Sequence, residues 1–354
     1  MERISQPQLL IVFFFLILQA IYFGTNLSAI GYNVWVAIGF GTIGGISIGM
    51  IGLSLARKWP NEFFVLYGHK IVGKWLHIPY VILSIFLFLL VGAIQFRGLQ
   101  NLLLLYFLPN TPGWSFSMVF GICVALAARS GIEAIVRCAQ GFFFIVLLMQ
   151  ITIAMVLVND LNFNMGIAFL THVDLKTSVV ASLGIIPWAG LIFFVLFFFP
   201  YVANSKNSLK SLGYAVLLAN LILLMFTIVS ILLFGPELAK NVDLVKVFKY
   251  ISIADFLENL DPLILAVWLC SGFISISLSV FVALLCTAQL FSLKDYRPLT
   301  FSIVAIMIGL SFQIADNDAE LTRITQQWVT PFILFMELIP IVYWIVNRIR
   351  TKVR

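Results

Sequence analysis

Two long apolar stretches of this chain are interrupted by residues that open a helix. The first stretch, over about residues 8–30, contains Gly24, Thr25 and Asn26 in a row. Glycine leaves helical geometry at low steric cost, and a broken helix frees backbone amides and carbonyls. With the Thr25 and Asn26 side chains, these groups can bind a polar solute, and an α-carboxylate suits the amides at the start of a half-helix. The alternative interpretation is a helix that ends there.

The second interrupted stretch, over about residues 181–202, contains Gly184, Pro187 and Gly190. Proline has no amide hydrogen and cannot complete the helical hydrogen bond to the residue four positions earlier. Trp188 lies between these residues and could wall a pocket. The alternative is a proline kink that binds nothing.

The two interruptions occupy corresponding places in the two halves of the chain. Opened backbone is tolerated within a membrane only where it is buried in protein or lines a cavity. A matched pair of Gly/Pro-interrupted segments is a sequence indication of a transporter-type binding site near the middle of the bilayer. We therefore expect a site for a small solute where the two breaks meet.

The composition predicts an all-α integral membrane protein. Hydrophobic residues make up 62% of the chain, charged residues 10%, and the mean hydropathy is +1.08, whereas soluble domains carry about 25% charged residues. The net charge of +6 is spread between the apolar stretches, so we expect no nucleic-acid partner. No catalytic, cofactor or metal-ligand pattern stands out, which predicts a protein that is not an enzyme and needs no cofactor or metal.

Ten apolar stretches are long enough to cross a bilayer, and the whole chain, residues 1–354, reads as one transmembrane domain. The predicted spans cover residues 8–30, 33–55, 78–107, 115–128, 140–159, 181–203, 211–234, 261–290, 299–315 and 328–346. Most of the 21 Lys and Arg residues fall in the segments on the side of the N-terminus. The positive-inside rule then places both termini in the cytoplasm.

Five predicted spans precede the middle of the chain and five follow it. Because five is odd, the second half enters the membrane from the opposite side, which predicts inverted repeats over about residues 8–160 and 181–346. The interruptions then fall in the first and sixth helices. Two connections are predicted to lie along the membrane surface, residues 60–78 on the inner side and 235–260 on the outer side.

Several polar strings in the chain resemble a known family. They are ISQPQL (Ile4–Leu9), ARSGIEAIVR (Ala128–Arg137), GPEL (Gly235–Leu238), ISIADFLENLD (Ile251–Asp261) and LKDYRPL (Leu293–Leu299). The pattern resembles the B subunit of spore germination receptors, a permease-like family of the amino acid–polyamine–organocation superfamily. The resemblance implies an inner-membrane protein of the spore, in contact with lipid, with a receptor A subunit and a lipoprotein C subunit as partners. It also implies a fold of ten helices in two inverted repeats of five.

In that superfamily the third and eighth helices face the two broken ones. The resemblance therefore adds residues at helical spacing on these two helices to the expected site: Val91, Gln95 and Gly98 on the third, and Ser271, Gly272 and Ser275 on the eighth. The alternative is that small residues at these positions only allow close helix packing.

Two ionisable residues, Arg97 and Glu337, lie inside predicted spans. Such groups are costly in lipid and normally face the protein interior or a cavity. We expect both to face the bundle interior and to pair with each other. The alternative is that water or backbone groups satisfy each one separately.

Two functions fit these features. One is a germinant-sensing receptor subunit that binds a small polar metabolite, such as an amino acid, at the two breaks. The other is an ion-coupled secondary amino-acid transporter. A coupled transporter is expected to place carboxylates or hydroxyls around its broken helices, and no acidic residue lies near either break in the sequence. That absence, together with the resemblance, favours the receptor.

Overall fold

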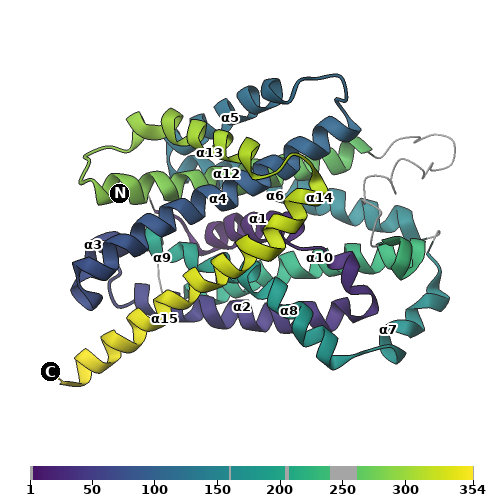
Figure 1. Ribbon diagram of the computed structural model, residues 1–354, viewed down its shortest axis with the longest axis horizontal. Helices are drawn as coiled ribbons and strands as arrows, with labels where there is room; N and C mark the ends of the chain where they lie inside the picture. The colour runs from purple at the N-terminus through teal and green to yellow at the C-terminus, as the bar shows by residue number, and fades with distance from the viewer. Residues whose placement is uncertain (1–2, 159–160, 204–206, 240–260, 354) are drawn as a thin grey trace.

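The computed structural model describes residues 3–158, 161–203, 207–239 and 261–353 (Figure 1). Most of the surface segment predicted over residues 235–260, and the string Ile251–Leu260, lie outside the described residues. Within them, ten helical segments are long and apolar enough to cross a membrane, which confirms the predicted number and the all-α class. Their bounds are Gln6–Gly24, Ala29–Ala56, Lys74–Tyr106, Gly113–Ser130, Ile132–Thr152, Leu175–Tyr201, Ser208–Glu237, Leu265–Leu290, Arg297–Ile314 and Asp318–Arg350.

The bundle is built around α1 (Gln6–Gly24), which runs through the middle of the molecule (Figure 1). Nearly all of its side chains from Leu9 to Ile21 are buried. Its neighbours include α4 (Lys74–Tyr106), α6 (Ile132–Leu157), α10 (Ser208–Ala239) and α12 (Asp261–Leu290). A helix that is apolar all round is typical of such a central position.

The first interruption lies at the end of α1. The helix is continuous to Gly24, Thr25 is extended, and the chain then forms the 3₁₀ segment η1 (Leu27–Asn33) before α2 (Val34–Ala56). The predicted span over residues 8–30 therefore ends about one and a half turns earlier than expected. This break opens the backbone at the end of the helix and not in its middle.

The second interruption divides the sixth span into four short pieces. The α-helix α8 (Leu175–Gly190) gives way to η4 (Leu191–Phe194), α9 (Val195–Phe198) and η5 (Phe199–Tyr201). The α-helical pattern is lost directly after Gly190, three residues beyond Pro187. Both residues are buried, so the opened backbone lies inside protein.

Close packing of α2 against α8 depends on glycines. A methyl carbon added to Gly41 would lie 2.6 Å from a carbon of Ile185, and one added to Gly45 would lie 2.5 Å from the side chain of Ala189. Backbones that approach this closely leave no room for side chains, as in other membrane helix pairs. The glycines of α2 therefore place α8 and its break.

The N-terminal end of the first interrupted span is tied to the C-terminal end of the sixth. Ile4 pairs with Val202 as an isolated bridge, because the Ile4 amide donates to the Tyr201 carbonyl (2.8 Å) and the Ala203 amide donates to the Ile4 carbonyl (2.9 Å). Ser5 and Gln8 form a capping box at the start of α1. The string ISQPQL thus has a structural role.

The remaining elements complete the wall of the bundle. They are α3 (Phe64–Val72), α5 (Gly113–Ser130), η3 (Phe163–Ile167), α7 (Ala168–Thr171), η7 (Arg297–Leu299), α13 (Thr300–Ile314), α14 (Asp318–Ile324), the π-helical turn η8 (Thr325–Val329) and α15 (Thr330–Val353). The predicted inner surface segment over residues 60–78 contains α3, but α4 already begins at Lys74.

Candidate functional site

Gly24 brings the first break into contact with the second. A methyl carbon added to Gly24 would collide with the indole ring of Trp188, so only glycine fits at this point of α1. Trp188 is fully buried, and its Nε1 donates to the Thr330 hydroxyl at 3.0 Å. Thr330 in turn donates to the Thr325 carbonyl in η8. The indole therefore joins the first, sixth and tenth spans.

The polar side chains of the first break serve the local backbone. The Thr25 hydroxyl donates to the Ile21 carbonyl at 2.8 Å, which closes the end of α1. The Asn26 side-chain oxygen accepts from the Ala29 amide and caps η1. Both groups are therefore used in shaping the break, and Asn26 is exposed.

At the second break the glycines differ. Gly184 has open space around it, whereas Gly190 lies against a carboxyl group. A methyl carbon added to Gly190 would lie 2.5 and 2.6 Å from the two carboxyl oxygens of Glu337, which comes from α15. Glu337 is 1% exposed, and neither of its oxygens has a hydrogen-bond partner among the described residues.

This contact corrects one step of the sequence analysis. The chain has no acidic residue near either break in sequence, but its fold places the Glu337 carboxyl group directly at the second break. The residues are 147 positions apart, so no local pattern reveals the contact. The absence of an acidic group therefore does not favour a receptor over a coupled transporter.

A second group of buried polar side chains lies between α1, α4 and α12. We call Gln19, Gln95, Ser271 and Ser275 the amide cluster. The Ser275 hydroxyl donates to the Gln95 side-chain oxygen at 2.5 Å. The Nε2 groups of Gln19 and Gln95 and the Ser271 hydroxyl have no hydrogen-bond partner among the described residues. The cluster therefore holds buried donors that protein groups leave unpaired, which is costly unless water or a ligand binds them.

Glycines bring the helices of the amide cluster together. A methyl carbon added to Gly272 would lie 3.2 Å from Gln19 Nε2, and one added to Gly98 would collide with the ring of Phe23, just before the first break. Val91 is buried one turn from Gln95. Gly98 and Gly272, two of the residues expected on the third and eighth helices, therefore lie directly against α1.

Gln19 was missed by the sequence analysis. It is the one strongly polar residue in the apolar run from Leu9 to Phe23, and that isolation was the available signal. Buried amides in membrane helices normally bond to other helices.

The expected pair between Arg97 and Glu337 is wrong. The Arg97 guanidinium donates to the Asp316 carbonyl (3.1 Å) and to the Gln100 side chain (3.4 Å). Arg97 is half-buried, while Glu337 lies in the core without a partner among the described residues. These separate surroundings agree better with the alternative interpretation, in which the two residues do not pair with each other.

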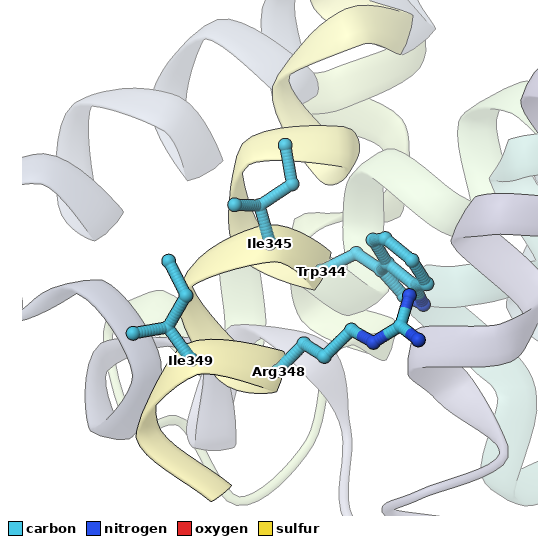
Figure 2. Close-up of a pocket in the computed structure, with 4 residues that line it drawn as sticks. All are labelled: Trp344, Ile345, Arg348 and Ile349. Carbon is cyan, nitrogen blue, oxygen red and sulfur yellow. The ribbon is translucent and has the colours of Figure 1, made fainter. Parts of the chain in front are cut away.

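A surface hollow on α15 is unrelated to these contacts. Trp344, Ile345, Arg348 and Ile349 line it and all project from this one helix (Figure 2). The Arg348 guanidinium lies 5.1 Å from the centre of the Trp344 ring. Trp and Arg near the end of a span are typical anchors at a membrane surface.

Comparison with known proteins gives the family. The model of a family described as "Spore germination protein" matches residues 3–319. This chain belongs to the spore germination protein family. "Spore germination protein YndE" of Bacillus subtilis (strain 168) is 22% identical over 329 residues, covering 90% of this chain and 88% of that protein. "Spore germination protein KB" of the same organism is 24% identical over 330 residues, covering 90% and 87%.

Among solved structures, this member of the spore germination family resembles Mhp1, a nucleobase-cation-symport-1 family transporter solved in a closed conformation with bromovinylhydantoin bound. The TM-score is 0.70 with 13% sequence identity, covering 97% of this chain and 78% of Mhp1. The likeness confirms a transporter-type fold for the chain.

Proposed function

We propose that this protein is the germinant-sensing subunit of a spore nutrient receptor. It binds a small polar metabolite, such as an amino acid, among the first, third, sixth and eighth spans. The unpaired donors of the amide cluster are the observation that supports this site most directly. The names of the relatives support the role in germination.

The chemistry of the amide cluster suits an oxygen-rich group. The NH₂ groups of Gln19 and Gln95 and the Ser271 hydroxyl are donors, and the Gln95 oxygen is already occupied by Ser275. A ligand carboxylate or carbonyl accepts from such donors. Trp188, packed on Gly24, then links the occupied site to the sixth and tenth spans. Ligand binding would favour one arrangement of these helices over another.

The remaining members of the proposed site have supporting roles. Gly24, Gly98, Gly190 and Gly272 permit close contacts, while Thr25, Asn26 and Pro187 shape the two breaks. Gly184 contacts nothing that a side chain would displace and contributes least.

The receptor is expected to work with partners. We propose contacts with a receptor A subunit and a lipoprotein C subunit in the inner membrane of the spore, with both termini in the cytoplasm. The family membership and the distribution of Lys and Arg support this arrangement.

An ion-coupled secondary amino-acid transporter is the second candidate. The observation that favours it is the Glu337 carboxyl group at the break of the sixth span, since intramembrane carboxyl groups often mark ion or proton pathways. In this case solute uptake into proteoliposomes would depend on an ion gradient.

Spores that carry Gln95→Leu test the site. We expect loss of germination in response to a complete amino-acid mixture, because the substitution removes both the unpaired NH₂ group and the partner of Ser275. Gln150→Leu is the matched control, since Gln150 is a buried glutamine in α6 outside the cluster. Immunoblots of spore membranes show whether both variants insert.

Normal germination of the Gln95→Leu spores at normal amino-acid concentrations would contradict the assigned site. Gradient-driven uptake of labelled amino acids by the purified protein would instead support the transporter.

A further inference from the structure

Glu337 is the most costly unpaired group in the described core. An ionised carboxylate away from water and without donors is strongly unfavourable, so such a group is neutralised or paired. It faces Gly190, where the α-helical hydrogen bonding of α8 stops. The protonation state of Glu337 and the conformation of the sixth span can therefore affect each other at this contact.

A row of ionisable side chains leads away from Glu337. The Tyr80 hydroxyl donates at 3.4 Å to the carbonyl of Met336, the residue directly before Glu337. The Tyr80 and Tyr343 rings are 5.6 Å apart between centroids. The Tyr343 hydroxyl lies 2.9 Å from His77 Nδ1.

His77 ends the buried part of this row. Its Nε2 lies 2.9 Å from the Val65 carbonyl, which can only accept, so Nε2 carries the hydrogen and Nδ1 is free to accept from Tyr343. The ring of His69 on α3 lies 6.5 Å from that of His77 and is partly exposed. Because α3 adjoins Phe63, which packs on Tyr201, this end is on the side where Ile4 pairs with Val202.

The other elements around Glu337 bring few competing charges. α2 has no ionisable side chain, η8 has none, and the one in α8 is Lys176 at its far end. α12 carries the buried Cys286 thiol, and α3 carries the buried Tyr67 and the exposed Lys70, which pairs with Glu62. The rings of Phe64 and Phe197 pack against Tyr80 and keep the row in apolar surroundings.

We propose that Glu337 is a proton-binding site whose proton exchanges with water on the side lined by Tyr80, Tyr343 and His77, and that loss of this proton is linked to rearrangement of the sixth span at Gly190. This goes beyond the proposed function and applies whether the solute is sensed or carried. In this exchange the Glu337 O–H bond breaks and a water molecule that reaches this side gains the proton, so that one carboxylate and one hydronium ion form together.

The buried position of Glu337 beside Gly190 suits the protonated, neutral form of its carboxyl group. The ionised form needs donors that are absent around Gly190 among the described residues, so it is stable only after water or freed backbone amides reach it. A proton needs no cavity, whereas a metal ion needs several oxygen ligands. These requirements favour a proton as the bound cation.

Infrared difference spectroscopy on the purified protein in lipid tests the proposal. We expect a carboxylic-acid C=O band that disappears on raising the pH and is missing in Glu337→Gln. Glu133→Gln, which changes a partly exposed carboxylate in the first turn of α6, should leave the band in place. A wild-type protein without such a band, or a band that survives in Glu337→Gln, would overturn the proposal.

A second measurement tests the side of exchange and keeps Glu337 intact. In Tyr343→Phe, proton–deuteron exchange of the same band should slow about tenfold, the change expected when one hydrogen bond is lost from a rate-limiting step. The midpoint of its pH titration should change little. Tyr214→Phe, an exposed tyrosine on α10, is the control. Unchanged exchange in Tyr343→Phe would exclude exchange on this side.

Discussion

The amide cluster and the Glu337 site are both buried polar regions, but they are satisfied differently. In the cluster, Ser275 and Gln95 bind each other and leave neutral donors free. At Glu337 an ionisable group has no partner among the described residues and contacts a glycine in an opened helix. Neutral donors suit a solute, whereas a lone carboxyl group suits a proton. The two proposals thus place ligand recognition and charge change in separate parts of one helix bundle.

Trp188 connects the two regions. It lies two residues before Gly190, packs on Gly24 at the end of α1, and bonds to Thr330 seven residues before Glu337. A shift of the sixth span would therefore change the contacts both at the end of α1 and at Glu337. The predictions below test how separate the two regions are.

The largest expected effect is from Gly190→Ala. The added carbon overlaps the Glu337 carboxyl group, and overpacking of this kind costs about 1–3 kcal/mol. Thermal unfolding in detergent should show a lower melting temperature, while Gly184→Ala, in open space, should change little. In a Glu337→Ala background the penalty of Gly190→Ala should shrink; an equal penalty would contradict the contact.

Separate replacement of Gln95 and of Glu337 by methionine should have opposite effects on the stability of the protein. Gln95→Met leaves the Ser275 hydroxyl without its partner and should destabilise the protein by about 2 kcal/mol. Glu337→Met removes an unpaired group and should raise the melting temperature. If Glu337→Met also lowers it, the carboxyl group has a stabilising partner and the contrast between the regions fails.

Trp188→Phe should have a smaller effect. It removes the hydrogen bond to Thr330 and part of the contact with Gly24, costing about 1 kcal/mol for the bond alone. Thr330→Val should lower the melting temperature similarly, and the double variant should not add the two losses. Full additivity would show that the bond does not contribute.

The smallest expected effect is from replacing Asp174, the residue that caps the start of α8. Hydrogen bonds from the Thr177 hydroxyl and the Lys176 amide lower the pKa of Asp174 below its usual value. Its stabilisation is therefore present above the unfolded-state pKa of about 3.9 and is lost as the pH falls through the lower folded-state pKa. Asp174→Ala should reduce the melting temperature slightly at neutral pH and remove this acid dependence; an unchanged profile would contradict the cap.

Much of the architecture could be read from local patterns. Apolar runs of sufficient length predicted the ten spans. Pro187 and Gly190 predicted the opening of the sixth span, because these two residues act on the backbone of their own segment. The first break was predicted in the right place but lies at a helix end, since Thr25 and Asn26 complete local caps that end α1 cleanly.

The sites themselves were only partly predictable. Gln95, Ser271 and Ser275 followed from helical spacing together with the family resemblance, whereas Gln19 needed the packing of α1 against Gly272 to be recognised. The predicted pair between Arg97 and Glu337 was wrong because opposite charges on two helices do not determine whether those helices face each other.

The sequence by itself determined the membrane class, the number of spans and the positions of the two helix interruptions, because hydrophobic length and backbone chemistry are local properties. Only the tertiary structure decided that Glu337 meets Gly190, that Trp188 covers Gly24, and that His77 and Tyr343 point toward each other. Those contacts join residues far apart in the chain, and they depend on how glycine-lined helices pack against one another.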